Sequence, residues 1–124
     1  MKLSNKEIDQ IIHSISSIKE KELPIKTLFK ITCIAKKLEP LVQAFDEIRK
    51  QITNKYAVLD ANGEVVVGEN QSVEIENYKG FQNDINELLN IECSVDIEKL
   101  SLSDFENVQI SPEVAIPLSY IIQE

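Results

Sequence analysis

The stretch ITCIAKKLEPLVQAFDEIRKQI, residues 31–52, decides the fold because its large apolar residues recur at alternating intervals of three and four. This spacing places them on one face of an α-helix, as in the seam of a coiled coil. The seam consists of Ile31, Ile34, Leu38, Leu41, Phe45, Ile48 and Ile52. We predict one long helix over residues 25–55, beginning just after Pro24. Pro40 lies inside it, and the sequence leaves open whether the helix is kinked or broken there.

A second seam with the same spacing predicts a shorter helix over residues 76–91. Its apolar positions are Tyr78, Phe81, Ile85 and Leu88. Residues 1–55 contain eleven Lys or Arg and seven Asp or Glu, a net charge of +4. Residues 56–124 contain two Lys or Arg and fourteen Asp or Glu, a net charge of −12. We therefore expect the two helices to pair as a long antiparallel hairpin, although each exposed ion pair contributes only about 0–1 kcal/mol.

The seam of the long helix has an alternative use. Its apolar face has room for the same face of a second copy of the chain, or for a partner protein, in place of the shorter helix. The sequence favours pairing within one chain, and a homo-oligomer stays open.

Local signals predict two further elements in the first two thirds of the chain. The SNKE motif at residues 4–7 is a capping box, and the apolar residues after it predict a helix over residues 5–19. The pair Asn62 and Gly63 is a strong turn signal between two apolar runs, so we predict a β-hairpin over residues 56–68.

The remainder of the chain is expected to add one strand and one short helix. Residues 93–98 alternate between apolar and polar, which is typical of a half-buried strand. Ser111 and Pro112 signal the start of a helix within the segment 110–124. The predicted fold is a single α+β domain over residues 1–124 that is predominantly α: a long antiparallel helical hairpin, a small β-hairpin and strand element, and a short C-terminal helix.

The C-terminal segment is unusually apolar for a chain terminus, where residues normally fray. The sequence favours its folding back onto the core, and the alternative is that it docks on a partner. In that second case the candidate docking residues are Val114, Leu118, Tyr120, Ile121 and Ile122.

Few residue types suited to catalysis occur in the sequence. His13 is the one histidine, and its neighbouring serines are not spaced to form a nucleophilic pair with it. Cys33 and Cys93 are far apart in apolar surroundings, so we expect two buried, reduced thiols and no zinc site. We predict a protein that is not an enzyme, with no catalytic residue, no metal and no cofactor.

Two groups of acids are considered as metal sites. The DANGE motif at residues 60–64 resembles the start of a calcium loop, but its glycine arrives two positions early, so we expect a turn. A second group near the C-terminus is interpreted as solvent-exposed. It consists of Asp96, Glu98, Asp104 and Glu106.

Charge and hydropathy set expectations for partners. The balance of −12 over residues 56–124 would repel a phosphate backbone, so nucleic-acid binding is disfavoured. The sequence lacks an apolar run of about 18 residues, the length that spans a membrane, so no membrane partner is expected. The partners we expect are other proteins.

Several motifs together resemble a family of short proteins from tailed phages and prophages whose function is unknown. The resemblance covers the opening MKLSNKEI, a long helix closing on Lys55 and Tyr56 before DANG at residues 60–63, the FQNDINELL helix from Phe81, and VDI at 95–97 with LSDF at 102–105. It implies a phage or prophage context and carries no catalytic residues over to this chain.

From these observations we expect a non-enzymatic protein-interaction component of a phage or prophage, either a minor virion or tail part or an assembly factor. The resemblance implies a location in the host cytoplasm, with incorporation into the virion left open. The alternative is a small acidic inhibitor or regulator that binds a host protein.

Overall fold

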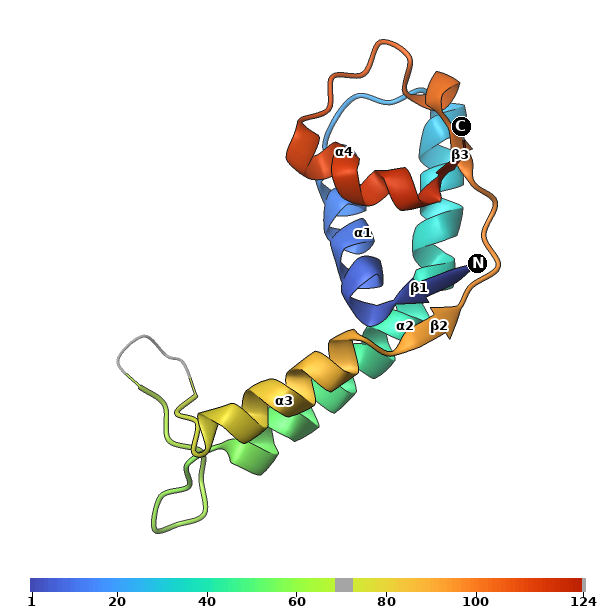
Figure 1. Ribbon diagram of the computed structural model, residues 1–124. Helices are drawn as coiled ribbons and strands as arrows, with labels where there is room; N and C mark the ends of the chain where they lie inside the picture. The colour runs from blue at the N-terminus through green and yellow to red at the C-terminus, as the bar shows by residue number, and fades with distance from the viewer. Residues whose placement is uncertain (69–72, 124) are drawn as a thin grey trace. The chain divides into compact units, whose positions relative to one another are not determined.

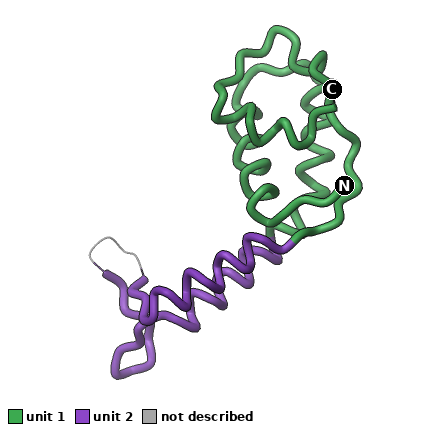
Figure 2. Tube along the Cα trace, in the orientation of Figure 1, with its two compact units in different colours: residues 1–42, 92–124 green, residues 43–91 purple. Residues whose placement is uncertain are grey.

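The contacts of the chain fall into two compact units in the computed structural model, which describes residues 1–68 and 73–123. Unit 1 consists of Met1–Val42 and Glu92–Glu124, and unit 2 consists of Gln43–Ile91 (Figure 2). The sequence predicts one domain over residues 1–124, and the structure has these two units within that span. Glu124, the last residue of the predicted C-terminal segment, lies outside the described residues.

Helix α2, Ile25–Tyr56, is the long helix that the seam predicts. It contributes residues up to Val42 to unit 1 and residues from Gln43 to unit 2. Pro40 lies inside the helix, so the chain remains helical across the proline and the alternative of a break is wrong. The missing proline N–H removes one backbone bond, and the bonds on either side are enough to continue the helix.

Unit 1 is built mainly from helices, with short strands that tie both ends of the chain to strands within residues 92–101 (Figure 1). Besides the first part of α2 its elements are β1 (Lys2–Ser4), α1 (Asn5–Ile18), β2 (Glu92–Ser94), β3 (Leu100–Ser101), η1 (Leu102–Phe105), α4 (Pro112–Leu118), η2 (Ser119–Ile121) and β4 (Ile122–Gln123). Strand β1 pairs antiparallel with β2, and β3 pairs parallel with β4. Helix α4 packs on α1.

The capping box at the start of α1 forms as predicted. The Ser4 Oγ accepts the Glu7 backbone N–H at 3.1 Å, and the Glu7 carboxylate accepts the Ser4 N–H at 3.0 Å. Both backbone donors would otherwise lack partners at a helix start. The helix runs over Asn5–Ile18, within one residue of the prediction.

The core of unit 1 draws apolar side chains from both ends of the chain. Its buried members come from α1, from the first part of the α2 seam, from the C-terminal segment and singly from β1, β3 and η1, and they lose nearly all contact with solvent. They are Leu3, Ile8, Ile11, Ile15, Ile18, Ile31, Ile34, Leu38, Leu100, Phe105, Leu118 and Ile121. Burying such side chains is the main stabilising contribution to this unit.

The strand predicted over residues 93–98 is shorter in the structure, where β2 covers Glu92–Ser94. Its partner β1 has only three residues, with Leu3 opposite Cys93. Beyond the strand, the Val95 N–H still donates to the Met1 carbonyl at 2.9 Å. Residues 95–98 are not in a strand, although Val95 and Ile97 still pack against the core, so the alternating burial that suggested a longer strand remains.

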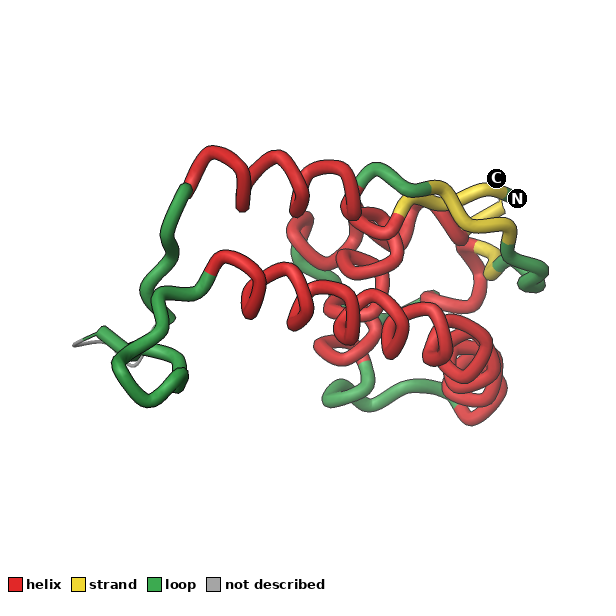
Figure 3. The backbone as a smooth tube through the Cα atoms, turned by 90° about the horizontal axis from the view of Figure 1, so that it is seen from below, coloured by secondary structure: helices red, strands yellow, loops and turns green. Residues whose placement is uncertain are grey.

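Unit 2 contains an antiparallel helical hairpin. The second part of α2 and helix α3 (Tyr78–Leu89) lie side by side, joined by the segment between them (Figures 1 and 3). The pairing is antiparallel because Tyr56, at the end of α2, contacts Phe81 near the start of α3. The structure is therefore α+β and predominantly α, with the predicted helical hairpin formed by unit 2 alone.

The predicted β-hairpin centres on Gly63. Leu59 and Val65 form an antiparallel bridge, and the Gly63 N–H donates to the Asp60 carbonyl at 3.0 Å. Gly63 has a φ of +78°, whereas Asn62 does not adopt a positive φ, so the turn is a type I turn followed by a left-handed glycine. Of these two turn residues, only the glycine adopts a positive φ.

In the segment between α2 and α3, three extended pieces are each hydrogen-bonded to the other two. The Val58 N–H donates to the Glu74 carbonyl at 2.9 Å, the Glu74 N–H to the Val66 carbonyl at 3.0 Å, and the Val66 N–H to the Val58 carbonyl at 2.8 Å. Each piece therefore bonds to both others and leaves no long unpaired edge among the described residues of this segment.

Candidate protein-docking grooves

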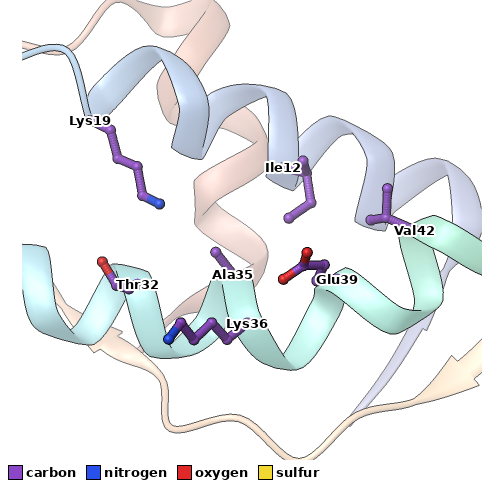
Figure 4. Close-up of a pocket in the computed structure, with 7 residues that line it drawn as sticks. All are labelled: Ile12, Lys19, Thr32, Ala35, Lys36, Glu39 and Val42. Atoms are coloured by element: carbon purple, nitrogen blue, oxygen red, sulfur yellow. The ribbon is translucent and has the colours of Figure 1, made fainter.

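A groove in unit 1 lies between α1 and α2 (Figure 4). Apolar side chains from both helices form part of its wall, and three charged side chains and one threonine complete it. The apolar residues are Ile12, Ala35 and Val42, and the polar ones are Lys19, Thr32, Lys36 and Glu39. The space measures about 310 Å³, and this volume suits one or two apolar side chains of a binding partner.

The α1 seam and the α2 seam explain this groove. Ile11 and Ile31 point into the core and are fully buried, whereas Ile12 and Ala35 lie at the edge of the two stripes and are only half-buried. When the apolar stripe of a helix is wider than the area that its partner helix covers, one edge of the stripe stays open to solvent. The result is an apolar strip with a mostly cationic rim.

Unit 2 has a larger groove of about 530 Å³ along its helical hairpin. Helix α2 contributes the polar wall and α3 the apolar one. The lining residues are Arg49, Lys50, Thr53, Asn54, Val73, Phe81 and Ile85. Two cations therefore flank an apolar strip in a unit whose balance is negative: unit 2 holds four Lys or Arg and nine acids, which gives −5.

The two helices of unit 2 are held by a polar cluster around Asp84. The Tyr56 hydroxyl donates to the Asp84 carboxylate at 2.9 Å, and the Lys55 ammonium does so at 3.3 Å. The Tyr56 hydroxyl, followed by Lys55, holds the pKa of the Asp84 carboxyl below its usual value against a smaller desolvation effect. The same contact with Asp84 raises the pKa of Lys55. These bonds fix the end of α2 against α3 and so shape the groove beside them.

The start of α3 depends on the backbone conformation of Asn77 and on the absence of a side chain at Gly80. Asn77 has a φ of +56° and its side chain caps the helix by accepting the Gly80 N–H at 3.3 Å. A Cβ at Gly80 would lie 3.1 Å from Tyr56 Cε1 and 2.6 Å from the Asn77 amide nitrogen. Gly80 therefore allows α3 to approach Tyr56 closely.

Asp104 is buried, and its prediction as a solvent-exposed acid is wrong. Its carboxylate accepts the Ser101 N–H at 2.8 Å and pairs with the Lys30 ammonium at 3.1 Å. The Ser101 amide, then Lys30 and the Ser101 hydroxyl, hold the pKa of this carboxyl below its usual value although burial opposes the shift. The Thr27 hydroxyl also donates to the Asp104 carbonyl at 2.6 Å, so the cluster joins α2 to η1 in unit 1. Its geometry is structural.

Most of the predicted docking residues of the C-terminal segment are covered. Leu118 and Ile121 are fully buried in unit 1, and Val114 and Ile122 pack against that core. Tyr120 is 42% exposed. The alternative in which the segment docks on a partner is wrong for Leu118 and Ile121, because both complete the core instead.

The predicted helix seam is divided between the two units. Ile31, Ile34 and Leu38 are buried in unit 1, and Leu41 packs against the same core. In unit 2, Phe45 is buried, Ile52 is half-buried and Ile48 is 41% exposed. The prediction of one continuous seam paired with α3 is therefore wrong for its first half, since only residues from Gln43 onward belong to the unit that contains α3.

The seam of α3 is buried unevenly. Leu88 is buried, Phe81 and Ile85 are half-buried, and Tyr78 is exposed. Phe81 contacts the Tyr56 ring edge-on and the Tyr78 ring in a tilted arrangement, with centroids 6.2 Å apart in both pairs. A two-helix hairpin buries one line of side chains well and leaves the next line open to solvent, which produces the apolar wall of the groove.

The side chains considered for catalysis or metal binding are His13, Cys33, Cys93 and Asp60. His13 is exposed on α1, and its Nδ1 lies 2.7 Å from the Asp9 carbonyl of the same helix. Cys33 is exposed and Cys93 is half-buried, so the prediction that both thiols are buried is wrong. The Asp60 carboxylate accepts the N–H groups of Asn62 and Glu64, so it serves the turn. Within residues 1–68 and 73–123, no group of three or more His, Cys, Asp or Glu side chains is arranged to hold a metal ion.

The grooves themselves were not predicted from the sequence. A signal for the unit 1 groove was present in the sequence, because Ile12 and Ala35 are apolar residues that lie beside the buried positions of α1 and α2. The seam pattern alone does not indicate which edge remains open.

In the part of the chain that the structure describes, none of the helices combines the length and the apolar character that crossing a membrane requires. Comparison of the chain with protein-family models, curated proteins and solved structures finds no match.

Proposed function

We propose that this chain is a non-enzymatic protein-interaction component of a phage or prophage, acting either as a minor virion or tail part or as an assembly factor. The phage context rests on the resemblance of its sequence motifs to short phage and prophage proteins. The interaction role rests on the open grooves. Each combines an apolar strip with charged sides, which is the composition of a surface that binds the face of a helix or a short peptide.

The unit 2 groove is the observation that carries the proposal. Burial of the side chains in its apolar wall would stabilise the hairpin, yet Phe81 and Ile85 remain half-exposed beside Arg49 and Lys50. Binding is favourable when a partner covers such apolar side chains and places carboxylates beside the flanking cations. Such a surface binds protein.

The histidine supports a role without catalysis. His13 is exposed on α1 and contacts only Asp9 of its own helix among the polar groups of the described chain. A general base needs a substrate proton within hydrogen-bond reach and a neighbouring group that orients the ring toward it. His13 has the neighbour, and it lines a groove of about 410 Å³ with Glu113 and Ile116, but this groove is wide open to solvent.

The test is affinity purification of the tagged full chain from phage-producing cells, with quantitative mass spectrometry. Enrichment of phage structural or assembly proteins over an untagged control is the expected result. Enrichment of host proteins alone would favour the acidic regulator and contradict the proposal. Mass spectrometry of purified particles then separates the two forms of the proposal, since a virion part is retained in particles and an assembly factor is not.

A further inference from the structure

Helix α2 carries a second apolar stripe, on the face of unit 1 that points away from the core. Ile25, Phe29 and Cys33 follow one another at intervals of four, so they lie on one side of the helix. Ile25 is 85% exposed and Phe29 is 69% exposed, and Cys33 is exposed as well. We call Ile25, Phe29 and Cys33 the outer stripe.

The outer stripe borders a groove of about 260 Å³ between α2 and the segment that contains Ile97. Its walls are mostly apolar with three charged side chains, all within unit 1. They are formed by Phe29, Lys30, Cys33, Ile34, Lys37, Ile97 and Glu98. A large aromatic side chain at the mouth of a groove is typical of a protein-binding site.

Lysines outnumber acids around the outer stripe, where Asp104 and Glu98 are the acids placed closest to it. Residues 25–38 contain four lysines, at 26, 30, 36 and 37, and no acidic residue. Both Lys30 and Lys37 line the groove. Asp104 offsets the charge of Lys30, from which it lies 3.1 Å away, whereas Lys37 donates at 2.7 Å to the neutral Asp96 carbonyl and so keeps its charge. Glu98 is the one acid that lines this groove.

We propose that the outer stripe docks an acidic amphipathic helix of a partner protein. The stripe spans two helical turns, about 12 Å, which matches apolar side chains at successive turns of a partner helix. Carboxylates along the edge of that helix would meet the lysines of residues 25–38, which gives the complex its charge complementarity. The proposal rests on the proposed function as an interaction protein and names one surface and the chemistry of its partner.

A second copy of the chain is a poorer occupant of this stripe. Two copies that met through it would bring the lysines of both α2 segments together, and Asp104 and Glu98 would offset only part of their charge. An anionic membrane is disfavoured for a different reason. The whole chain carries a net charge of −8, which an anionic surface repels, whereas a single helix contacts only the local lysines.

Cys33 provides a reporter within the outer stripe. Its thiol is exposed, so its alkylation by iodoacetamide should slow when a partner covers the groove. Cys93 is half-buried near the Asn5 side chain oxygen, at 3.6 Å, and serves as the internal reference in the same molecule. Both rates are measured on the full chain by peptide mass spectrometry.

The probe is a synthetic helical peptide of roughly 18 residues with leucines on one face and glutamates on its flanks. Its twin has every glutamate replaced by lysine. The acidic peptide should slow Cys33 alkylation about fivefold or more at sub-millimolar concentration, and the twin should have little effect. Phe29→Glu should abolish the protection, whereas Ile116→Glu, which replaces an exposed apolar residue on α4, should retain it.

Four outcomes would overturn the proposal. They are no protection by the acidic peptide, equal protection by the lysine twin, protection that grows with protein concentration alone, and protection by vesicles of phosphatidylserine and phosphatidylcholine in place of the peptide. The third outcome would assign the stripe to a second copy and the fourth to a membrane. If Phe29→Glu leaves recovery of phage proteins intact while Lys50→Glu in the unit 2 groove abolishes it, the proposed function stands and this inference fails.

Discussion

Tyr56 donates its hydroxyl hydrogen to the Asp84 carboxylate at 2.9 Å, and this bond ties the last residue of α2 to α3. Lys55 adds a second bond to the same carboxylate at 3.3 Å and lies over the Tyr56 ring, 5.1 Å from its centroid. The unit 2 groove lies along the same two helices. The geometry of the candidate docking surface therefore depends on a short polar contact as well as on apolar packing.

Tyr56→Phe should raise the pKa of Asp84 toward its ordinary value. The Tyr56 hydroxyl is the largest cause of the lowered pKa, and Lys55 contributes less, so Lys55→Met should produce a smaller rise. NMR titration of the Asp84 carboxyl measures both. Tyr78→Phe removes a hydroxyl from an exposed tyrosine of the same unit and should leave this pKa unchanged. An unchanged pKa in Tyr56→Phe would contradict the contact.

The buried Asp104 predicts acid sensitivity in unit 1. Its folded pKa is lowered from 3.8, so the stabilisation it supplies is complete above the unfolded pKa and disappears as the pH falls through the folded value. Asp104→Asn should therefore be less stable than the natural chain at neutral pH, and the difference should shrink below about pH 4. Urea unfolding at several pH values measures it. A difference that stayed constant into acid would show that the carboxylate charge is not the cause.

Gly80→Ala should destabilise unit 2 although alanine is the better helix former. The added Cβ would lie 3.1 Å from the Tyr56 ring and 2.6 Å from the Asn77 amide, whose side chain is held by its capping bond. We expect a cost of about 1–2 kcal/mol in the free energy of unfolding. The cost should be smaller in an Asn77→Gly background, which removes the nearer contact. Equal costs in both backgrounds would place the strain elsewhere.

Leu118→Ala should cost about 2–5 kcal/mol in the free energy of unfolding, because it leaves a cavity in a fully buried position. Tyr120→Ala, two residues later and 42% exposed, should cost much less. Chemical denaturation followed by circular dichroism compares the two variants. Similar small costs would mean that the C-terminal segment does not complete the core.

Local sequence signals predicted the helices well. The Ser4 and Glu7 pair set the start of α1, and the Gly63 turn lies where the Asn-Gly signal placed it. These features depend on bonds between residues a few positions apart, so their physical cause is contained in a short stretch.

Among the features that depend on distant residues, the hairpin of α2 and α3 was predicted, whereas the strand partners and the division of the α2 seam were not. Nothing near Cys93 indicates that its partner is Leu3, because a strand pattern states which face is apolar and not which strand lies beside it. The seam of α2 is continuous in sequence, yet Leu38 serves unit 1 and Phe45 unit 2. Heptad spacing identifies an apolar face without naming its partner, so the division into units and the grooves appear only in the structure.

The most direct test of the interaction role compares two charge reversals in unit 2 by affinity purification from phage-producing cells. Lys50→Glu changes a residue of the groove wall, and Lys79→Glu makes the same charge change on an exposed residue of α3 outside the groove lining. Circular dichroism of both purified variants first establishes that they are folded. We predict that Lys50→Glu reduces the recovery of phage proteins at least about tenfold, a loss of about 1.4 kcal/mol of binding free energy, while Lys79→Glu leaves it unchanged. Equal recovery with both variants would contradict docking through this groove.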